Sequence, residues 1–317
     1  MMLSFLVKRS LDLLFVLFGV SVLVFLMIRL IPGDAVQIML GANTEITPEG
    51  LAALREKLGL NKPIFVQYWD WLSAALRGDL GQSIWTGRPI SEEILQRLPI
   101  TLELTVLSLV IAIGLAIPVG VLTAYWRNSR AEYLIRLFSI TGVTLPSFWL
   151  GTLLIFLVFK LAPGWQSLGY VPFSQDPWGH LSRLVLPVVT LSLPMLAGLS
   201  RVLRSSLLDV LNQDYIRTAR SKGLSERVVL YKHALRNAMI PLVTVIGIQV
   251  GYLFGGAIVV EQVFAIPGMG RLILGAINER NYPLIQGAIL LVTTAFVLIN
   301  LLVDLIYAKL DPRVEYA

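Results

Sequence analysis

Residues 212–241 read NQDYIRTARSKGLSERVVLYKHALRNAMIP, a basic stretch between long apolar runs. Gly223 can adopt the left-handed conformation that ends a helix, and Ser225 can cap the helix that follows. Leu224 and Val229 stand at the positions of a hydrophobic staple. The stretch therefore predicts two short helices at a sharp angle. They would project beyond the apolar segments, where another molecule could bind them.

The composition favours a membrane protein. The chain has 317 residues, of which 56% are hydrophobic and 15% charged, and its mean hydropathy is +0.75. Soluble domains carry about a quarter charged residues. The net charge of +6 suggests nucleic acid as an alternative partner. However, the basic residues follow the predicted topology and form no stripe on a soluble face, so nucleic acid is excluded. Without cysteine, the chain has no disulfide, thiolate metal site or cysteine nucleophile.

Six apolar runs predict six transmembrane helices. The first run, residues 11–31, is long enough to cross a core of about 30 Å. It is followed by Pro32 and Gly33 and not by a small-residue cleavage site, which favours a retained span over a cleaved signal peptide. The other spans are expected near 100–124, 134–160, 184–206, 239–262 and 284–308. Prolines inside them predict kinks that either line a pathway or reflect simple packing; these are Pro118, Pro146, Pro187 and Pro194.

Charge placement predicts the orientation. Basic residues concentrate at the N-terminus, in 125–136, in 201–238 and in the tail, which by the positive-inside rule are cytoplasmic. The chain is thus expected to be an all-α polytopic membrane protein, N-in and C-in. Its predicted parts are a first transmembrane helix (1–31), an extracytoplasmic helical lobe (32–99), a five-helix core (100–308) with a cytoplasmic loop (207–238), and a cytoplasmic tail (309–317).

The lobe is predicted to contain three helices. Thr47 and Pro48 begin the first helix, whose apolar face is Leu51, Leu54 and Leu58. The second covers 63–77 and stops at Gly78. The third opens at Ser91, with Glu92 and Glu93 in its first turn.

Small residues recur every four positions in the fifth span, at Gly247, Gly251 and Gly255. Such a stripe lets a second helix approach closely. It is either a packing seam within the chain or a seam against a partner subunit or pathway wall. Pro146 and Pro194 join these glycines as helix-packing or pathway candidates.

The chemistry of an enzyme is missing from the sequence. There is no phosphate-binding loop of the Gly-x4-Gly-Lys-Ser/Thr type. His180 and His233 are the only histidines and are predicted on opposite sides of the membrane, so they cannot share a metal ion. Acids within the spans, Glu103 and Glu261, lie near helix ends, as does the Asn300–Asp304 pair, which favours interface solvation or structural pairing over a proton relay. We expect no catalytic residue, cofactor or metal, and no enzymatic activity.

At residues 214–223 and 233–241 the sequence resembles the cytoplasmic EAA loop of ABC importer permeases, in the form found in the dipeptide, oligopeptide and nickel importer family. The general consensus is Glu-Ala-Ala, three residues, then Gly; of those positions only Ala219 and Gly223 match, while Arg217 and Thr218 depart from it. The interval from Gly223 to Pro241 is also longer than in that consensus. Residues 20–34, 255–264, 267–271, 300–304 and 311–313 resemble the same family, and the long outer lobe is similar to its "B" type permease.

The resemblance implies a type I ABC importer permease in the cytoplasmic (inner) membrane. The expected partners are a second homologous permease, two ATPase subunits, an extracytoplasmic solute-binding protein and membrane lipid. ATP would be bound by the ATPase subunits and not by this chain. The loop 207–238 would then be a coupling loop, with a coupling helix that enters a groove on an ATPase. The residues expected to couple are Asp214, Tyr215, Arg217, Ala219, Lys222, Gly223, Leu224 and Ser225. The alternative is a basic loop that lies on anionic lipid.

The resemblance leaves the solute open. Short peptides are the first expectation, and glutathione, nickel chelates or opines are alternatives within the family. A self-contained channel or secondary carrier is a different class of function. It is disfavoured because no internal repeat of the kind common in secondary transporters is evident.

Overall fold

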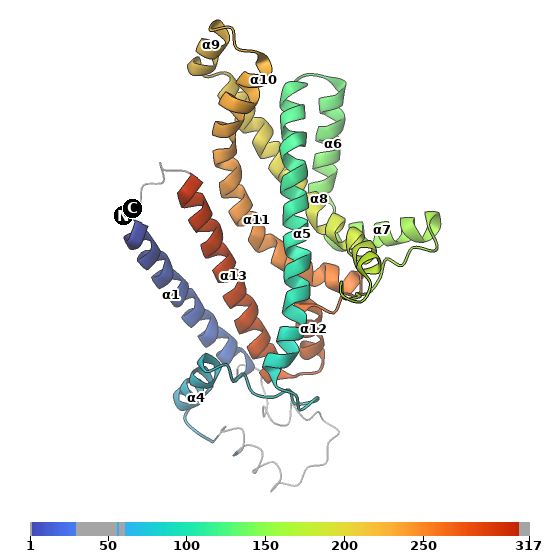
Figure 1. The fold of residues 1–317 in the computed structure, drawn as a ribbon. Helices are drawn as coiled ribbons and strands as arrows, with labels where there is room; N and C mark the ends of the chain where they lie inside the picture. The colour runs from blue at the N-terminus through green and yellow to red at the C-terminus, as the bar shows by residue number, and fades with distance from the viewer. Residues whose placement is uncertain (1, 30–55, 57–60, 311–317) are drawn as a thin grey trace. The chain divides into compact units, whose positions relative to one another are not determined.

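The computed structural model describes residues 2–29, 56 and 61–310. Within these residues all regular secondary structure is helical. One isolated β-bridge pairs Gln82 with Pro89. The helices are α1 (Met2–Arg29), α4 (Ile64–Leu76), α5 (Ile90–Tyr125), α6 (Arg130–Thr144), α7 (Ser147–Leu161), α8 (Pro177–Leu211), α9 (Asp214–Ser221), α10 (Glu226–Val228), the π-helix η1 (Val229–Ala234), α11 (Leu235–Val263), α12 (Met269–Asn278) and α13 (Tyr282–Leu310). Figure 1 labels all of them except η1.

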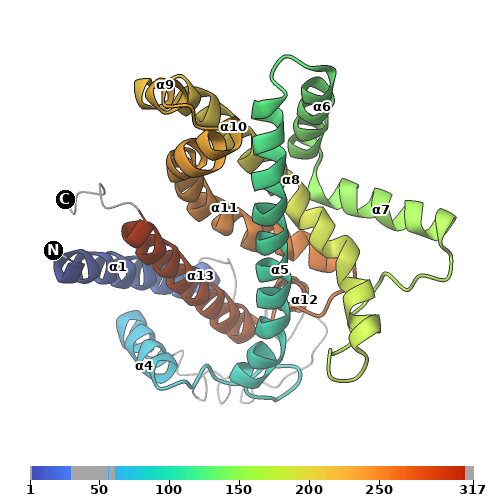
Figure 2. The ribbon, with the colours of Figure 1, turned by 45° about the horizontal axis from the view of Figure 1, so that its top comes forward.

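In the described part of the chain, five helical stretches are long and apolar enough to cross a membrane: one each in α1, α5, α8 and α13, and Glu226–Leu253. The expected third span, 134–160, is not one straight helix. It is the pair α6 and α7, bent by 111°, and α7 runs away from α6 in Figures 1 and 2. Leu145 is extended (ψ 127°) and Pro146 caps α7. The break lies there because a residue before proline avoids the helical region and proline has no N–H to donate.

No helix end separates the lobe from the second span. The expected third lobe helix and the second span form one 36-residue helix, α5, which continues through Pro99 and Pro118. Likewise α8 continues through Pro187 and Pro194. Transmembrane helices tolerate proline because neighbouring groups satisfy the freed carbonyls. Only at Pro146, of the prolines predicted inside spans, does the helix end.

One compact unit draws on Met1–Ile100 and Gly268–Ile299. Its hydrophobic core joins the start of α5 to α12 and α13, and the buried members are Ile90, Ile94, Met269, Leu272, Ala276, Tyr282, Leu284, Ile285 and Ala288. The loop before α5 is held by Asn281 Nδ2, which donates to Ser83 Oγ at 2.7 Å, and by Trp85 Nε1, which donates to the Glu279 carbonyl at 2.8 Å. The predicted second lobe helix is confirmed as α4, whereas the expected first one lies outside the described residues.

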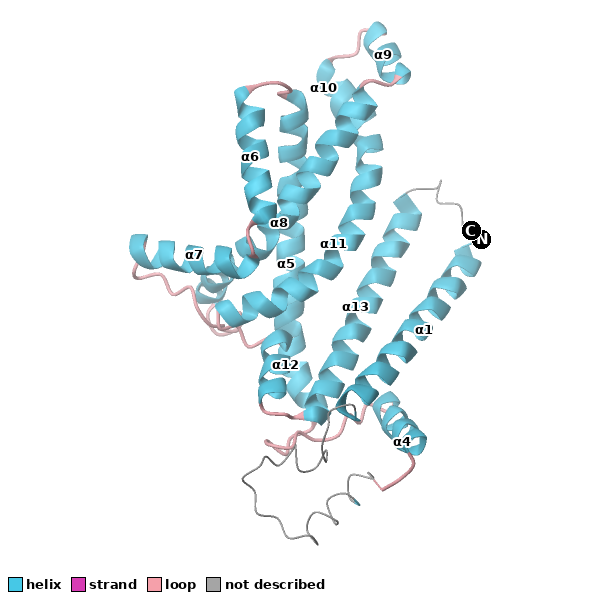
Figure 3. Cartoon of the chain, turned by 180° about the vertical axis from the view of Figure 1, so that it is seen from behind, coloured by secondary structure: helices cyan, strands magenta, loops and turns pink. Residues whose placement is uncertain are grey.

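The second unit covers Thr101–Pro267, with α8 at its centre. α6 and α11 pack on α8 from either side (Figure 3). Glycines permit the closest approaches: a Cβ on Gly120 would lie 3.0 Å from Leu203, and one on Gly151 would lie 3.0 Å from Phe264. Leu199, Leu203 and Leu207 of α8 are fully buried. This packing fixes the ends of α8 and α11, between which the basic stretch is inserted.

Candidate functional site

The basic stretch forms α9, a turn over 222–225, α10 and η1, at the ends of α8 and α11 (Figure 1). The residues predicted to couple all lie in α9 or in the turn. Asp214, Tyr215, Arg217 and Ala219 belong to α9, and Lys222, Gly223, Leu224 and Ser225 follow it. The structure thus brings the predicted residues together in one local segment.

Gly223 ends α9 as predicted. Its φ is +77°, and its N–H donates to the Arg220 carbonyl at 2.9 Å. The Leu224 N–H donates to the Ala219 carbonyl at 3.4 Å. These two bonds are the paired interactions of a Schellman motif with glycine at C′. The turn therefore has a defined geometry set by Gly223.

The second helix differs from the prediction. Ser225 has the extended N-cap backbone (ψ 147°), but its side chain makes no capping bond. Leu224 remains 39% exposed while Val229 is buried. The helix is also not short and separate, because α10, η1 and α11 run on as one continuous helical stretch. The π-turn accommodates one residue more than an α-turn, so Val229 and Ala234, five residues apart, both reach the core.

α9 packs on η1 through one face. Ile216 is fully buried and Ala219 is only 7% exposed. Ala219 therefore contributes to the packing of α9 within this chain. The exposed face presents Arg217, whose side chain is 72% exposed, and the turn presents Lys222. Arg217 Nη1 also lies 3.3 Å from Oδ1 of the exposed Asp214, so the surface left for a partner carries both signs of charge, with basic residues in excess.

Two side-chain contacts hold the segment together. Arg220 forms a fork on Glu226, with Nε 2.7 Å from Oε1 and Nη2 3.2 Å from Oε2, and so spans the Gly223 turn. Tyr215 OH accepts a hydrogen bond of 2.7 Å from Asn237 Nδ2 of α11. Sequence reasoning did not identify the roles of Arg220, Glu226 or Asn237. Opposite charges on either side of a helix-ending glycine were the available signal for the Arg220–Glu226 pair.

The small-residue stripe of Gly247, Gly251 and Gly255 does not pack closely against another helix of this chain along its whole length. Gly247 and Gly251 are partly exposed, and a Cβ on Gly255 would meet nothing within 4 Å. The close approach is instead at Gly256, where a Cβ would lie 3.2 Å from Leu191. Within the chain, Gly255 therefore faces open space. Of the proline candidates, Pro146 marks the α6–α7 break, whereas Pro194 lies within the continuous helix α8.

Acids near the span ends are structurally paired. Glu103 lies 2.8 Å from Nε2 of buried His180 and accepts from Tyr170 OH at 3.1 Å. Burial, together with the charge and hydrogen bond of Glu103, raises the pKa of Tyr170. Glu261 is fully buried and accepts from Thr101 Oγ1 at 2.5 Å. The Asp304 side chain lies outside the described residues, and so does its expected pairing with Asn300. Among the described residues no group of three or more His, Asp or Glu side chains is placed to hold a metal ion.

Comparison with known proteins covers almost the full chain. Residues 116–316 match the family described as "Binding-protein-dependent transport system inner membrane component", and residues 2–105 match its N-terminal family. The chain is 43% identical to the glutathione transport system permease protein GsiC of Escherichia coli over 99% of its own length and all of the relative. GsiC of Salmonella typhimurium is 42% identical with the same coverage.

A solved structure agrees on the fold. An inward-facing structure of the MetNI methionine ABC transporter aligns with a TM-score of 0.54 at 18% identity, over 69% of this chain and 96% of that one. This places the helices in the type I permease arrangement. The chain belongs to the binding-protein-dependent inner membrane components, the permease subunits of ABC importers, as its EAA-like loop predicted.

Proposed function

We propose that this chain pairs with a second homologous permease to form one translocation pathway for a short peptide, with glutathione as the first candidate. Membership of the family implies ATPase and solute-binding partners. The full-length identity to a glutathione permease supports the solute class, because glutathione is itself a tripeptide. Nickel chelates and opines remain the alternatives within the family.

The ATP-driven step is proposed to belong wholly to the partners. The sequence has no phosphate-binding loop. The chain would therefore bind no cofactor and catalyse no reaction. It would need a rigid structural element through which the ATPase can transmit its motion. Two ATPase subunits per permease pair complete the proposed assembly.

The proposed coupling element is α9 with its turn. The observation that supports this proposal is the set of contacts that hold the segment against the rest of the chain. Ile216 is buried, and the Arg220–Glu226 ion pair spans the turn. Tyr215 is hydrogen-bonded to Asn237 of α11. A displacement of α9 would therefore be passed to α11 as a rigid-body motion rather than absorbed by the loop. The exposed Arg217 and Lys222 then form the contact surface with the ATPase.

Charge reversal tests this contact. We expect Arg217→Glu combined with Lys222→Glu to reduce ATPase co-purification and solute uptake together, while the permease pair itself is still recovered. The matched control is Arg127→Glu with Arg130→Glu, an equal charge change at exposed residues of the α5–α6 turn. ATPase binding and uptake at control level in the Arg217/Lys222 variant would refute docking at α9. Substitution of Ala219 is unsuitable because that residue is buried within the chain.

The solute is tested separately. The partner binding protein is purified without added ligand, and the small molecule it retains is identified by mass spectrometry. We expect glutathione or another short peptide, and uptake of labelled glutathione that depends on this chain and on ATP. A retained nickel chelate or opine would replace the peptide assignment. Solute flux through this chain alone in liposomes would instead support a channel or carrier.

A further inference from the structure

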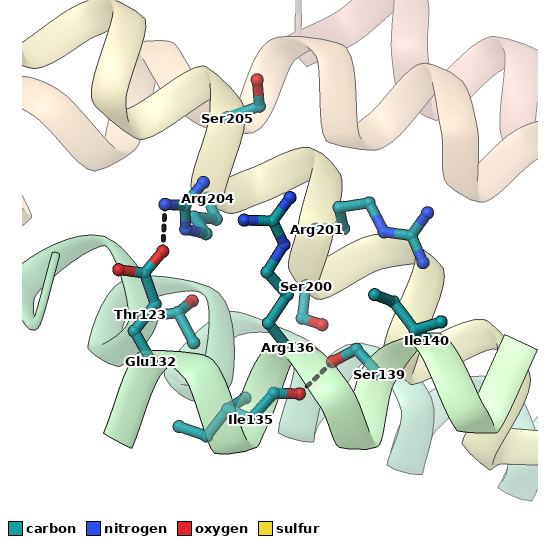
Figure 4. Close-up of a pocket in the computed structure, with 10 residues that line it drawn as sticks. All are labelled: Thr123, Glu132, Ile135, Arg136, Ser139, Ile140, Ser200, Arg201, Arg204 and Ser205. Carbon is teal, nitrogen blue, oxygen red and sulfur yellow. Dashed lines mark hydrogen bonds and ion pairs between the residues drawn. The ribbon is translucent and has the colours of Figure 1, made fainter. Parts of the chain in front are cut away.

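A pocket of about 210 Å³ lies between α5, α6 and α8, away from the coupling segment. Its lining combines three arginines, one glutamate, four hydroxyl side chains and two isoleucines, namely Thr123, Glu132, Ile135, Arg136, Ser139, Ile140, Ser200, Arg201, Arg204 and Ser205. Figure 4 shows these side chains, with the Arg136 side chain extending from α6 toward α8. Neither the coupling contact nor the small-residue stripe uses any of them.

The lining carries an excess of positive charge. Glu132 is its one carboxylate, and this group is already engaged, because Arg204 Nη2 donates to it and the Asn128 N–H donates to it at 2.6 Å. Glu132 is also within the electrostatic influence of Arg136, so one carboxylate faces three arginines; Arg136 and Arg201 are exposed at the edge of the pocket. The formal charge of the lining is +2. An anionic group is the complementary ligand.

The hydrogen-bonding groups of the pocket also favour an anionic ligand. In the described part of the chain the buried Nε of Arg204 has no acceptor. The hydroxyls of Ser139 and Ser200 donate to carbonyls of their own helices and so present oxygen lone pairs to the pocket. A ligand with a negatively charged acceptor and hydroxyl donors would satisfy both sets of groups.

The surroundings of the pocket identify the source of the anion. Thr123 lies next to the exposed aromatic residues Tyr125 and Trp126, at the end of α5 that the charge bias places in the cytoplasm. Paired aromatic residues of this kind mark the level of lipid headgroups. The outer side of α6 beside the pocket is apolar and exposed: Leu134 is 68%, Leu137 62% and Phe138 57% exposed. An anionic headgroup in the pocket would therefore have a surface for its acyl chains directly alongside.

We propose that this pocket binds the headgroup of an anionic phospholipid from the cytoplasmic leaflet, with its phosphate between Arg136 and Arg201. Basic pockets between transmembrane helices at this depth suit such headgroups. A free phosphate or a peptide carboxylate would use the arginines but not the apolar face of α6. Because the lipid would touch both α6 and α8, it would tie the broken third span to the central helix of its unit.

The test uses the purified importer complex in detergent and native mass spectrometry. Phosphatidylglycerol and phosphatidylcholine with identical acyl chains are added in turn, and the bound fraction of each is measured. We expect the complex to bind phosphatidylglycerol at least about tenfold more tightly, which corresponds to about 1.4 kcal/mol. Arg136→Gln with Arg201→Gln should abolish this preference. The control, Arg127→Gln with Arg130→Gln, removes the same charge from the neighbouring turn and should retain it.

Three further outcomes bear on the proposal. The Arg136→Lys, Arg201→Lys variant keeps the charge and should keep a preference for phosphatidylglycerol, which separates loss of binding from loss of fold. Inorganic phosphate should compete only weakly because it lacks acyl chains. Equal binding of the two lipids by the unaltered complex, an equal loss in the control variant, or displacement of phosphatidylglycerol by glutathione would each overturn the lipid site. None of these results depends on which solute is imported or on ATPase docking at α9.

Discussion

At Gly223 a side chain would be unfavourable because of the backbone conformation and not because of a steric clash. A Cβ at this position would meet no atom within 4 Å, yet φ is +77°. The penalty for any other residue is therefore backbone strain and not collision. Gly275 in α12 also has open space around it, but it has ordinary helical geometry. The two positions separate the effect of conformation from the effect of bulk.

Gly223→Ala is expected to destabilise the turn locally by about 1 kcal/mol, because alanine tolerates the left-handed region poorly. Hydrogen exchange at the amides of residues 223 and 224, whose bonds close α9, should become about fivefold faster. Gly275→Ala should leave exchange in the turn unchanged and slightly stabilise α12. Unaltered protection in Gly223→Ala would show that packing by Ile216, and not the glycine, holds the turn.

At the scale of elements, the π-turn η1 is the feature that distinguishes this loop. It lies inside the interval from Gly223 to Pro241, the interval that is longer than in the general EAA consensus. A π-turn absorbs one inserted residue and leaves the flanking helical faces in register. Val229 and Leu230 at the start of η1 and Ala234 at its end are all buried. We interpret η1 as the way the extra length is accommodated.

Deletion of Lys232 should therefore be tolerated, since it removes the extra residue and converts η1 to α-helix. Deletion of Arg236, a basic and exposed residue of α11, should not be tolerated. It would rotate the remainder of α11 by about 100° relative to α9. Size-exclusion recovery of the permease and the amount of co-purified ATPase report the difference. If both deletions were equally harmful, η1 would not be acting as an insertion.

The elements that could be predicted from the sequence are those with local causes. Gly223 at C′, the helix 64–76 after Pro63 and the six apolar runs depend on residues within one or two turns. The 111° break at Pro146 could not be told from a mild kink, because proline at the other predicted sites leaves its helix continuous. The π-turn depends on burial of Val229 against neighbouring helices, and the pocket with Arg136, Arg201 and Arg204 depends on the pairing of α6 with α8.

The proline at the α6–α7 break offers a direct test at this scale. The chain has no cysteine, so Phe138→Cys and Phe156→Cys, at positions exposed by 57% and 63%, give two specific sites for spin labels. With the 111° bend the backbones at these positions lie about 15 Å apart, and a straight helix would separate them by about 27 Å. Pro146→Ala should shift the distance distribution toward the longer value, whereas Leu145→Ala should not. An unchanged distribution would mean that the close contact of Gly151 with Phe264 maintains the bend.

At the scale of the whole molecule, one face of α11 is left exposed by the residues that the structure describes. Ile248 and Tyr252 are 61% and 73% exposed, and Gly255 lies on the same side one turn further along. Exposed apolar residues in a membrane protein can simply face lipid. A small residue that meets nothing, in a stripe with Gly247 and Gly251, is instead what a closely approaching helix requires. We propose that this face contacts the second permease of the proposed pair.

Two adjacent glycines make this assignment testable. Gly255→Leu should leave the chain folded, because its side chain has room, yet reduce the recovered partner permease about tenfold through a loss of about 1.4 kcal/mol of interface packing. Gly256→Leu should destabilise the chain itself, because its side chain would collide with Leu191 of α8. Thermal unfolding of the isolated chain and co-purification of the tagged partner distinguish the two effects. If Gly255→Leu recovered as much partner as the unaltered chain, this face of α11 would contact lipid, and the pathway would have to close against another helix.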